Sequence, residues 1–424
     1  MDRRRCLAAL TALLVGGVVA CTAATPAPSA IVVSPISPTS PTSHSPAVPT
    51  ASPSASASAT TAPSEQAVRP SPNRLELEVG QLNPDWVWPM LDFASDSYAV
   101  IYSSGVLDGP VGDGAPDLWR YIPGQPQPEL LWRNPERDRQ LAKVAGDTDV
   151  WAFSEISSLG ERWWSLWLLT EPGGEPLLLD SHPGDEDIPS IVPSFDVDAG
   201  RVAWTSFDRG FNGTAVTQLW MAEAPEWEPR LLAEADAAQR AFWLPSVYAD
   251  QVAYVDVAIG ADPAEDVRHV MLLDFSTPGA VPVQLDTSGN ATMPILNDDG
   301  VTWKEPDAGF AMFNWGRLFR YSFETQAIST LRIGPQEYVN YPSGGGRFVA
   351  MWGADSSKFA VHDLERGASR TIARYDDGID SITRPNLAGD LLVWLHAQND
   401  GMGQGPPSPL EYAWLPEPGM DRGK

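Results

Sequence analysis

Four polar residues occupy equivalent places in a repeating sequence pattern, each two positions after a large residue of a predicted strand. They are Glu155, Asp256, Glu305 and His396. Because side chains alternate along a strand, each should lie on the same side of its sheet as that large residue. Carboxylates around one opening could bind a cation, or act as acid and base on a sugar. The alternative interpretation is that strand ends facing water are polar.

A second set of candidates lies in or beside the long connections between the second and third strands of the repeats. It consists of Trp163, Arg209, Phe211, Phe310, Phe313 and Trp315. Exposed aromatic side chains at such a place would suit a protein, peptide or glycan partner. The alternative is that these side chains pack down on the rims of the sheets.

The common catalytic and metal-binding motifs are absent from the sequence. It contains no HExxH zinc motif, no GxSxG nucleophile elbow and no Walker or dinucleotide-binding fingerprint. Its two cysteines are Cys6 and Cys21, so the chain beyond them offers no thiol for redox chemistry or zinc. Segments 108–117 and 375–380 are rich in Asp and could hold calcium, but they lack the spacing of a twelve-residue calcium loop. We therefore expect no cofactor and no metal, and assign no catalytic residue.

The candidate residues are positioned by a repeat of about 50 residues. Segments 245–254, 294–303, 342–351 and 385–394 show it most clearly. Each begins with proline, continues through a turn rich in Asp, Asn or Gly, and ends on a large residue. The large residues of the seven repeats are Tyr102, Phe153, Trp204, Tyr254, Trp303, Met351 and Trp394.

Each repeat offers four short apolar runs separated by turn residues, a pattern typical of antiparallel strands. No stretch shows sustained helical periodicity. One such sheet cannot bury both of its faces alone, so the repeats predict an all-β fold, a seven-bladed β-propeller with aromatic side chains between the blades. The seventh repeat ends after its third strand. We expect segment 74–79 to complete the last blade, which would leave no free sheet edge at the seam.

These repeats resemble those of TolB-like and WD-repeat propellers, in which a proline-turn-strand phrase precedes a strand containing Leu-Trp. The resemblance covers residues 73–424 and implies a propeller fold with a scaffolding role in the cell envelope. The Ser-Pro-Asp-Gly turn of TolB repeats and the Gly-His and Trp-Asp dipeptides of WD repeats are absent.

The N-terminus has the features of an export signal. Residues 1–5 are basic, and the apolar run 6–20 is short for a membrane span. The sequence Val-Val-Ala-Cys that ends at Cys21 resembles the bacterial lipobox, which implies that Cys21 becomes the lipidated first residue of the mature protein. The alternative is an ordinary signal peptide in which Cys21 is incidental.

The remaining chain divides into a stalk and the propeller. We expect residues 1–20 to be the signal peptide and 21–72 to be disordered, because residues 22–72 hold 11 prolines and few charges. A net charge of -27 argues against nucleic-acid binding. The sequence thus predicts a monomeric lipoprotein of the cell membrane or outer membrane, whose propeller recognises an envelope protein, a peptide or a cell-wall glycan. The alternative is a propeller-type glycoside hydrolase.

Overall fold

The computed structural model gives all-β architecture to the part of the chain that it describes. The described residues are 77–82, 90–96, 98–104, 117–135, 139–157, 163–183, 191–210, 213–262, 265–306, 315–331, 339–353, 358–374, 380–382, 385–398 and 410–416. The predicted signal peptide, Cys21 and stalk lie outside them. Within the described ranges, no helix has the length and apolar character needed to cross a membrane.

Four sheets of four antiparallel strands follow one another along the chain. The first consists of β2 (Met90–Ser95), β3 (Val100–Ser104), β4 (Asp117–Tyr121) and β5 (Glu129–Trp132). The second consists of β6 (Arg139–Asp147), β7 (Val150–Ser157), β8 (Trp163–Leu169) and β9 (Leu177–Pro183). The third consists of β10 (Ser194–Asp198), β11 (Arg201–Arg209), β12 (Ala215–Glu223) and β13 (Arg230–Asp236). The fourth consists of β14 (Arg240–Tyr248), β15 (Gln251–Ala258), β16 (Val267–Asp274) and β17 (Val283–Gln284).

An eight-stranded sheet comes next and contains two successive repeats. Its first half has β18 (Thr292–Asn297), β19 (Gly300–Pro306), β20 (Gly316–Ser322) and β21 (Ile328–Leu331). Its second half has β22 (Val339–Gly345), β23 (Phe348–Gly353), β24 (Lys358–Asp363) and β25 (Ala368–Arg374). The pairing of Gly316 with Val339 joins the two halves.

The last sheet joins the end of the domain to its beginning. It contains β26 (Asp380–Ile382), β27 (Asn386–Ala388), β28 (Leu391–Gln398), β29 (Leu410–Trp414) and β1 (Val79–Gln81). β1 pairs antiparallel with β29, and Gly80 lies opposite Tyr412. The predicted closure by the N-terminal strand is therefore confirmed. The paired residues begin at the last residue of the predicted segment, and residues 74–76 lie outside the described residues.

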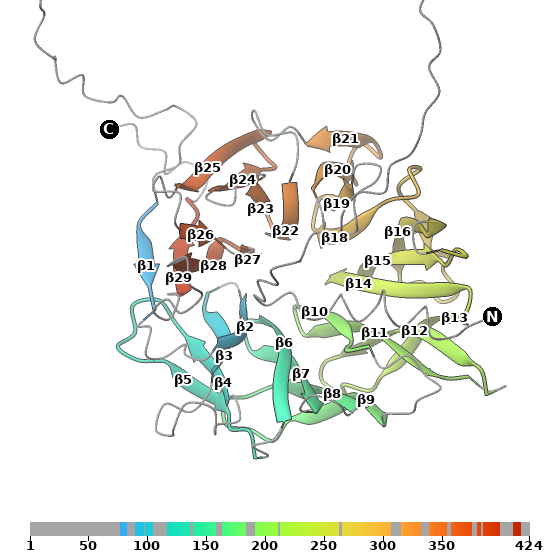
Figure 1. The fold of residues 1–424 in the computed structure, drawn as a ribbon, viewed down its shortest axis with the longest axis horizontal. Coiled ribbons are helices and arrows are strands. Elements are labelled where there is room, and N and C mark those ends of the chain that lie inside the picture. The colour runs from blue at the N-terminus through green and yellow to red at the C-terminus, as the bar shows by residue number, and fades with distance from the viewer. Residues whose placement is uncertain are drawn as a thin grey trace, which may run out of the picture. The chain divides into compact units, whose positions relative to one another are not determined.

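The sheets form a closed ring, which Figure 1 shows with β1 in blue beside β29 in red. The first strand of each repeat contacts the first strand of the next in the order β2, β6, β10, β14, β18, β22 and β27, and β27 contacts β2. This arrangement is a β-propeller. That it has seven blades remains a prediction from the repeats. Each large residue of the repeat is at most 2% exposed, so the core lies between adjacent sheets as predicted.

Hydrogen bonds near the first turn of each repeat connect neighbouring sheets around the whole ring. Each bond joins a donor of one sheet to an acceptor of the adjacent sheet. The donors and their acceptors are Thr148 N to Asp96 O, Ala199 N to Asp147 Oδ2, Val247 N to Asp196 Oδ2, Leu296 N to Ser246 Oγ, Asn297 Nδ2 to Gly346 O, Leu387 N to Ser343 Oγ and Ala388 N to Ser95 Oγ. Their lengths run from 2.7 to 3.2 Å. The ring is thus held by polar contacts as well as by its apolar core.

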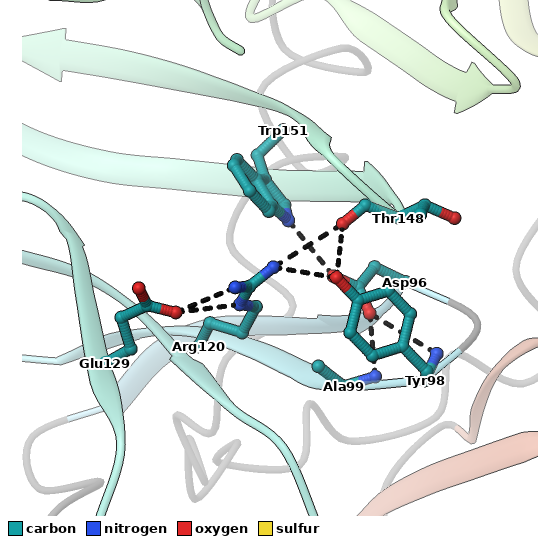
Figure 2. Close-up of polar contacts among 7 residues, drawn as sticks. All are labelled: Asp96, Tyr98, Ala99, Arg120, Glu129, Thr148 and Trp151. Atoms are coloured by element: carbon teal, nitrogen blue, oxygen red, sulfur yellow. Dashed lines mark hydrogen bonds and ion pairs between the residues drawn. The ribbon is translucent and has the colours of Figure 1, made fainter. Parts of the chain in front are cut away.

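Asp96 is the centre of one of these junctions (Figure 2). It is fully buried. Its Oδ1 accepts the backbone N–H of Ala99 at 2.7 Å, and its Oδ2 accepts Nε1–H of Trp151 from the next sheet at 3.1 Å. Burial raises the pKa of Asp96 to about 7, although these hydrogen bonds oppose the rise. A carboxyl group here therefore carries a proton at pH values where an exposed one is ionised.

Arg120 completes this junction, which we call the turn-face latch. Its guanidinium lies 4.9 Å from the ring of Trp151 and donates to the hydroxyl of Tyr98 at 2.9 Å and to Glu129 at 2.7 Å. The Tyr98 hydroxyl donates to the carbonyl of Thr148 at 2.8 Å. The turn-face latch consists of Asp96, Tyr98, Arg120, Glu129, Thr148 and Trp151. It is on the face of the propeller that carries the turns between first and second strands.

The first strand of several repeats contains a β-bulge just before the repeat's proline. Register shifts occur in β14, β18 and β22. The residues that precede the prolines there, Leu244, Met293 and Tyr341, have φ values of 50°, 52° and 42°. Positive φ is unfavourable for side chains of this size, so the neighbouring sheets must impose it.

Candidate functional site

The face opposite the latch carries the connections from second to third strand and from one repeat to the next. We call it the loop face. Among the predicted polar residues there, Glu155 on β7 is 1% exposed. Its Oε2 accepts Nε1–H of Trp167 at 2.6 Å and Nη1–H of Arg139 at 3.3 Å. The Arg139 guanidinium in turn lies 4.8 Å from the ring of Trp163, a predicted binding residue. These contacts give Glu155 and Trp163 a packing role within one sheet.

Asp256 and Glu305 are on adjacent sheets. Asp256 Oδ2 forms an ion pair with Arg240 Nη1 at 3.4 Å, and burial raises the pKa of Asp256 against the effect of that cation. Glu305 Oε1 accepts Nε1–H of Trp303 at 2.9 Å. Burial raises the pKa of Glu305, and the nearby carboxylate of Asp286 raises it further.

His269 and Asp286 lie between these two predicted residues. His269 is the cross-strand partner of Asp256, and its Nδ1 is 3.1 Å from Asp286 Oδ2. Asp286 also accepts the backbone N–H of Val270 at 2.7 Å, so the connection after β17 is fixed. The structure thus groups an imidazole with carboxylates from two sheets. The sequence prediction missed His269 and Asp286 because neither follows a large residue at the repeated spacing.

His396 on β28 belongs to a separate group. Its Nδ1 is 3.2 Å from Glu411 Oε1, while Glu411 Oε2 accepts Nε1–H of Trp394 at 2.6 Å. All three side chains are buried within the closing sheet. The Glu411 carboxylate is therefore the hydrogen-bond partner of an indole, as are those of Glu155 and Glu305.

Each of the four predicted polar residues has a contact within its own sheet, and their shared role around one opening stays a prediction. Glu155 contacts Arg139 and Trp167, Asp256 contacts Arg240, Glu305 contacts Trp303, and His396 contacts Glu411. In the described part of the chain, no group of three or more His, Cys, Asp or Glu side chains could hold a metal ion. Most of the two predicted calcium segments, 108–116 and 375–379, lies outside the described residues.

The predicted binding residues on the loop face have different outcomes. Phe211, Phe310 and Phe313 lie outside the described residues. Arg209 is exposed and donates from Nη1 to the carbonyl of Gly213 at 3.2 Å. Trp315 is half-buried beside β20, and its ring centroid is 6.1 Å from that of Trp352.

Trp315 belongs to a group of aromatic side chains at the junction of the two halves of the eight-stranded sheet. The ring of Trp352 on β23 is 6.0 Å from that of Tyr341 on β22, with an angle of 34° between the planes. The planes of Trp315 and Trp352 meet at 55°. All three side chains are half-buried, so the group combines ordered packing with access to solvent.

A buried lysine lies against this group. Lys304 on β19 is fully buried, and its Nζ donates to Asn340 Oδ1 at 2.6 Å and lies 5.9 Å from the Tyr341 ring. Burial lowers the pKa of Lys304 to about 7, because a charged ammonium loses its hydration there. Asn340 Oδ1 also accepts the backbone N–H of Tyr341 at 3.0 Å. We call Lys304, Trp315, Asn340, Tyr341 and Trp352 the loop-face cluster.

Sequence reasoning found one member of this cluster and missed four. Lys304 and Trp352 directly follow the large residue of their repeats, whereas the predicted polar residues come two positions after it. The residues directly after the large residues are Ser103, Ser154, Thr205, Val255, Lys304, Trp352 and Leu395. Four of the seven are small or β-branched and buried between sheets. The exchange of such residues for lysine and tryptophan in two successive repeats was a signal available in the sequence.

Comparison with known proteins supports the fold alone. No family model matches the sequence, and the search of curated proteins gives no match. A solved oligogalacturonate lyase in complex with manganese is similar to 80% of this chain over 94% of its own, with 13% identity and a TM-score of 0.50. The β-propeller domain of the trilobed protease from Pyrococcus furiosus is similar to 77% of this chain over 93% of its own, with 10% identity and a TM-score of 0.53. That domain is described as an open velcro, whereas here β1 pairs with β29. The described residues between 77 and 416 are therefore assigned, by architecture and structural likeness, to the β-propeller fold.

Proposed function

We propose that this protein is a binding lipoprotein whose propeller recognises a ligand through the loop-face cluster. The observation that carries the proposal is the group of half-buried rings of Trp315, Tyr341 and Trp352, at centroid distances of 6.0 and 6.1 Å. Aromatic side chains on a rigid scaffold bind at low entropic cost, because few rotatable bonds are fixed. The cluster also breaks the repeat, as expected of a site added to a fold rather than needed by it.

The cellular setting of the proposal comes from the N-terminal sequence. A basic start, a short apolar run and Cys21 after Val-Val-Ala support export and lipid attachment at Cys21. The proline-rich segment 22–72 would then separate the propeller from the cell membrane or outer membrane. The TolB-like pattern of the repeats supports a scaffolding role in the envelope, with a protein, peptide or cell-wall glycan as ligand.

The test is cross-linking and affinity capture of the full-length lipoprotein from intact envelopes. We expect Trp352→Ala to reduce the recovery of specific partners at least tenfold, since the central ring of the cluster is lost. Trp163→Ala is the matched control: it removes a loop-face tryptophan that packs on Arg139 in another sheet. An unchanged partner set with Trp352→Ala, or an equal loss with Trp163→Ala, would reject the proposed binding site.

A second candidate function is glycoside hydrolysis on the loop face. It is favoured by the carboxylates of Asp286 and Glu305, which come from adjacent sheets and interact, and by the raised pKa of Glu305. A carboxyl group that keeps its proton can act as general acid, and a second carboxylate can act as base or nucleophile. Release of reducing ends that Glu305→Gln abolishes would favour this function over binding alone.

A further inference from the structure

We propose that the loop-face cluster binds a sugar ring of a neutral glycan, with one face of the pyranose against Trp352 and its aromatic neighbours. This inference rests on the proposed binding function and names the class of ligand. Three features of the described residues carry it: the arrangement of the rings, the polar groups beside them and the local charge.

The three rings are tilted against one another. Neither neighbour of Trp352 is coplanar with it, since the interplanar angles are 34° with Tyr341 and 55° with Trp315. Tyr341 is held in place by the β-bulge of β22, where its φ is 42°. Because the rings are half-buried, they offer an apolar surface to the C–H face of a pyranose. Ligand sites commonly combine such apolar walls with a few placed polar groups.

The polar side chains beside the rings are those of Asn340 and Lys304. Asn340 Oδ1 accepts hydrogen bonds from Lys304 Nζ at 2.6 Å and from Tyr341 N at 3.0 Å, which fixes the orientation of the amide. Asn340 is 6% exposed, so its amide acts by holding the backbone of Tyr341, and with it the Tyr341 ring, in place beside Trp352. Lys304, which is buried, acts as a positioning residue.

The charge around the cluster favours an uncharged ligand. The chain has a net charge of -27, which repels a polyanion. Within the cluster, however, the titratable side chains are Lys304 and Tyr341, so the cluster itself has no carboxylate that would bind a cation. A neutral pyranose needs no charged partner. A neutral proline-rich peptide needs none either, and such peptides pack on aromatic grooves, so it is an outcome of the test.

The test measures binding to the purified full-length protein in detergent. Titration calorimetry and tryptophan fluorescence follow the addition of chitotetraose, maltotetraose, tetragalacturonate or a decaproline peptide. We expect at least one neutral tetrasaccharide to bind with a Kd at or below the millimolar range, about -4 kcal/mol, and to shift the tryptophan emission. Trp352→Ala should weaken this binding at least tenfold, and Trp352→Phe should restore part of it. Trp163→Ala is the control that leaves the cluster intact.

Other outcomes overturn the inference. Binding of decaproline but no tetrasaccharide would identify a peptide site, and stronger binding of tetragalacturonate than of either neutral sugar would reject the charge argument. Absence of saccharide binding at concentrations up to about 10 mM would reject the ligand class. If no saccharide binds but Trp352→Ala still loses its partners in envelope capture, the proposed binding function survives while the glycan inference fails. A second variant, Trp315→Ala, provides the same comparison if Trp352→Ala does not fold.

Discussion

The turn-face latch and the loop-face cluster lie at junctions between neighbouring repeats and use similar residue types, yet their surroundings differ. In the latch, Trp151 is 1% exposed, and its indole N–H is bonded to Asp96 at 3.1 Å. In the cluster, Trp352 and Trp315 are half-buried, with rings 6.1 Å apart. Tryptophan is therefore part of the buried structure at one junction and part of an accessible surface at the other.

Recurrence distinguishes the two regions further. The latch is one version of a contact found at successive turns, where Asp147 accepts the N–H of Ala199 at 2.7 Å and Asp198 that of Ala249 at 3.3 Å. The cluster replaces small buried residues of other repeats with Lys304 and Trp352. Ring closure needs the recurring contact at junction after junction. A site needs to be built once, so departure from the repeat is the better guide to function.

The largest expected difference is in stability. Trp151→Ala should lower the free energy of unfolding by about 3–5 kcal/mol, because it leaves a cavity and removes the hydrogen-bond donor to Asp96. Trp315→Ala should cost about 1 kcal/mol or less, since that ring is half-buried. Urea denaturation followed by circular dichroism measures both. Equal losses would remove the distinction between a structural and an accessible tryptophan.

An intermediate effect is expected in the dependence of stability on pH, with opposite signs in the two regions. The folded-state pKa of Asp96 is about 7 against 3.8 for the free side chain, so the folded state binds the extra proton between these values. Asp96 therefore makes stability fall as pH rises from about 4 to about 7. For Lys304, with a pKa of about 7 against 10.5, the unfolded state binds the extra proton, and stability rises between about 7 and 10.5.

Two variants separate these contributions. The wild-type free energy of unfolding should fall by on the order of a few kcal/mol between pH 4 and 7 because of Asp96, and Asp96→Asn should remove this fall. Lys304→Met should remove a comparable rise in the free energy of unfolding above pH 7. Urea midpoints at pH 5, 7 and 9 are compared with wild type, which cancels the titration of other groups. A pH profile that Asp96→Asn leaves unchanged would show that the latch carboxyl titrates normally.

The smallest expected effect concerns backbone strain. Thr148 in the latch has a φ of 49°, and its contact with Tyr98 uses its backbone carbonyl. Thr148→Gly should therefore keep that bond and raise stability by up to about 1 kcal/mol, because glycine tolerates positive φ. Tyr341→Gly, at a φ of 42° in the cluster, should instead reduce ligand binding by removing a ring of the site. Thermal unfolding and the saccharide titration measure the two results. A loss of stability in Thr148→Gly would show that the threonine side chain, rather than its backbone, holds this turn.

Much of the fold could be predicted because its signals are local. A proline, a turn and an apolar strand recur within each repeat, and β1 compensates for the strand that the final repeat lacks. The polar candidates show the limit of this reasoning. Alternation correctly places Glu155 and Glu305 near their large residues, but each carboxylate accepts an indole N–H at 2.6 or 2.9 Å within its sheet. Which indole each carboxylate bonds could not be inferred from the spacing of the repeats.

The sequence by itself determined the strands, their order and the closing partner, because each depends on alternation and on short-range turns. Tertiary structure alone decided which side chains meet across a junction. Lys304 reaches Asn340, 36 positions away along the chain, because β19 and β22 come from adjacent repeats and a bulge shifts the register of β22. Such contacts depend on how two sheets pack against each other, and no single repeat contains that information.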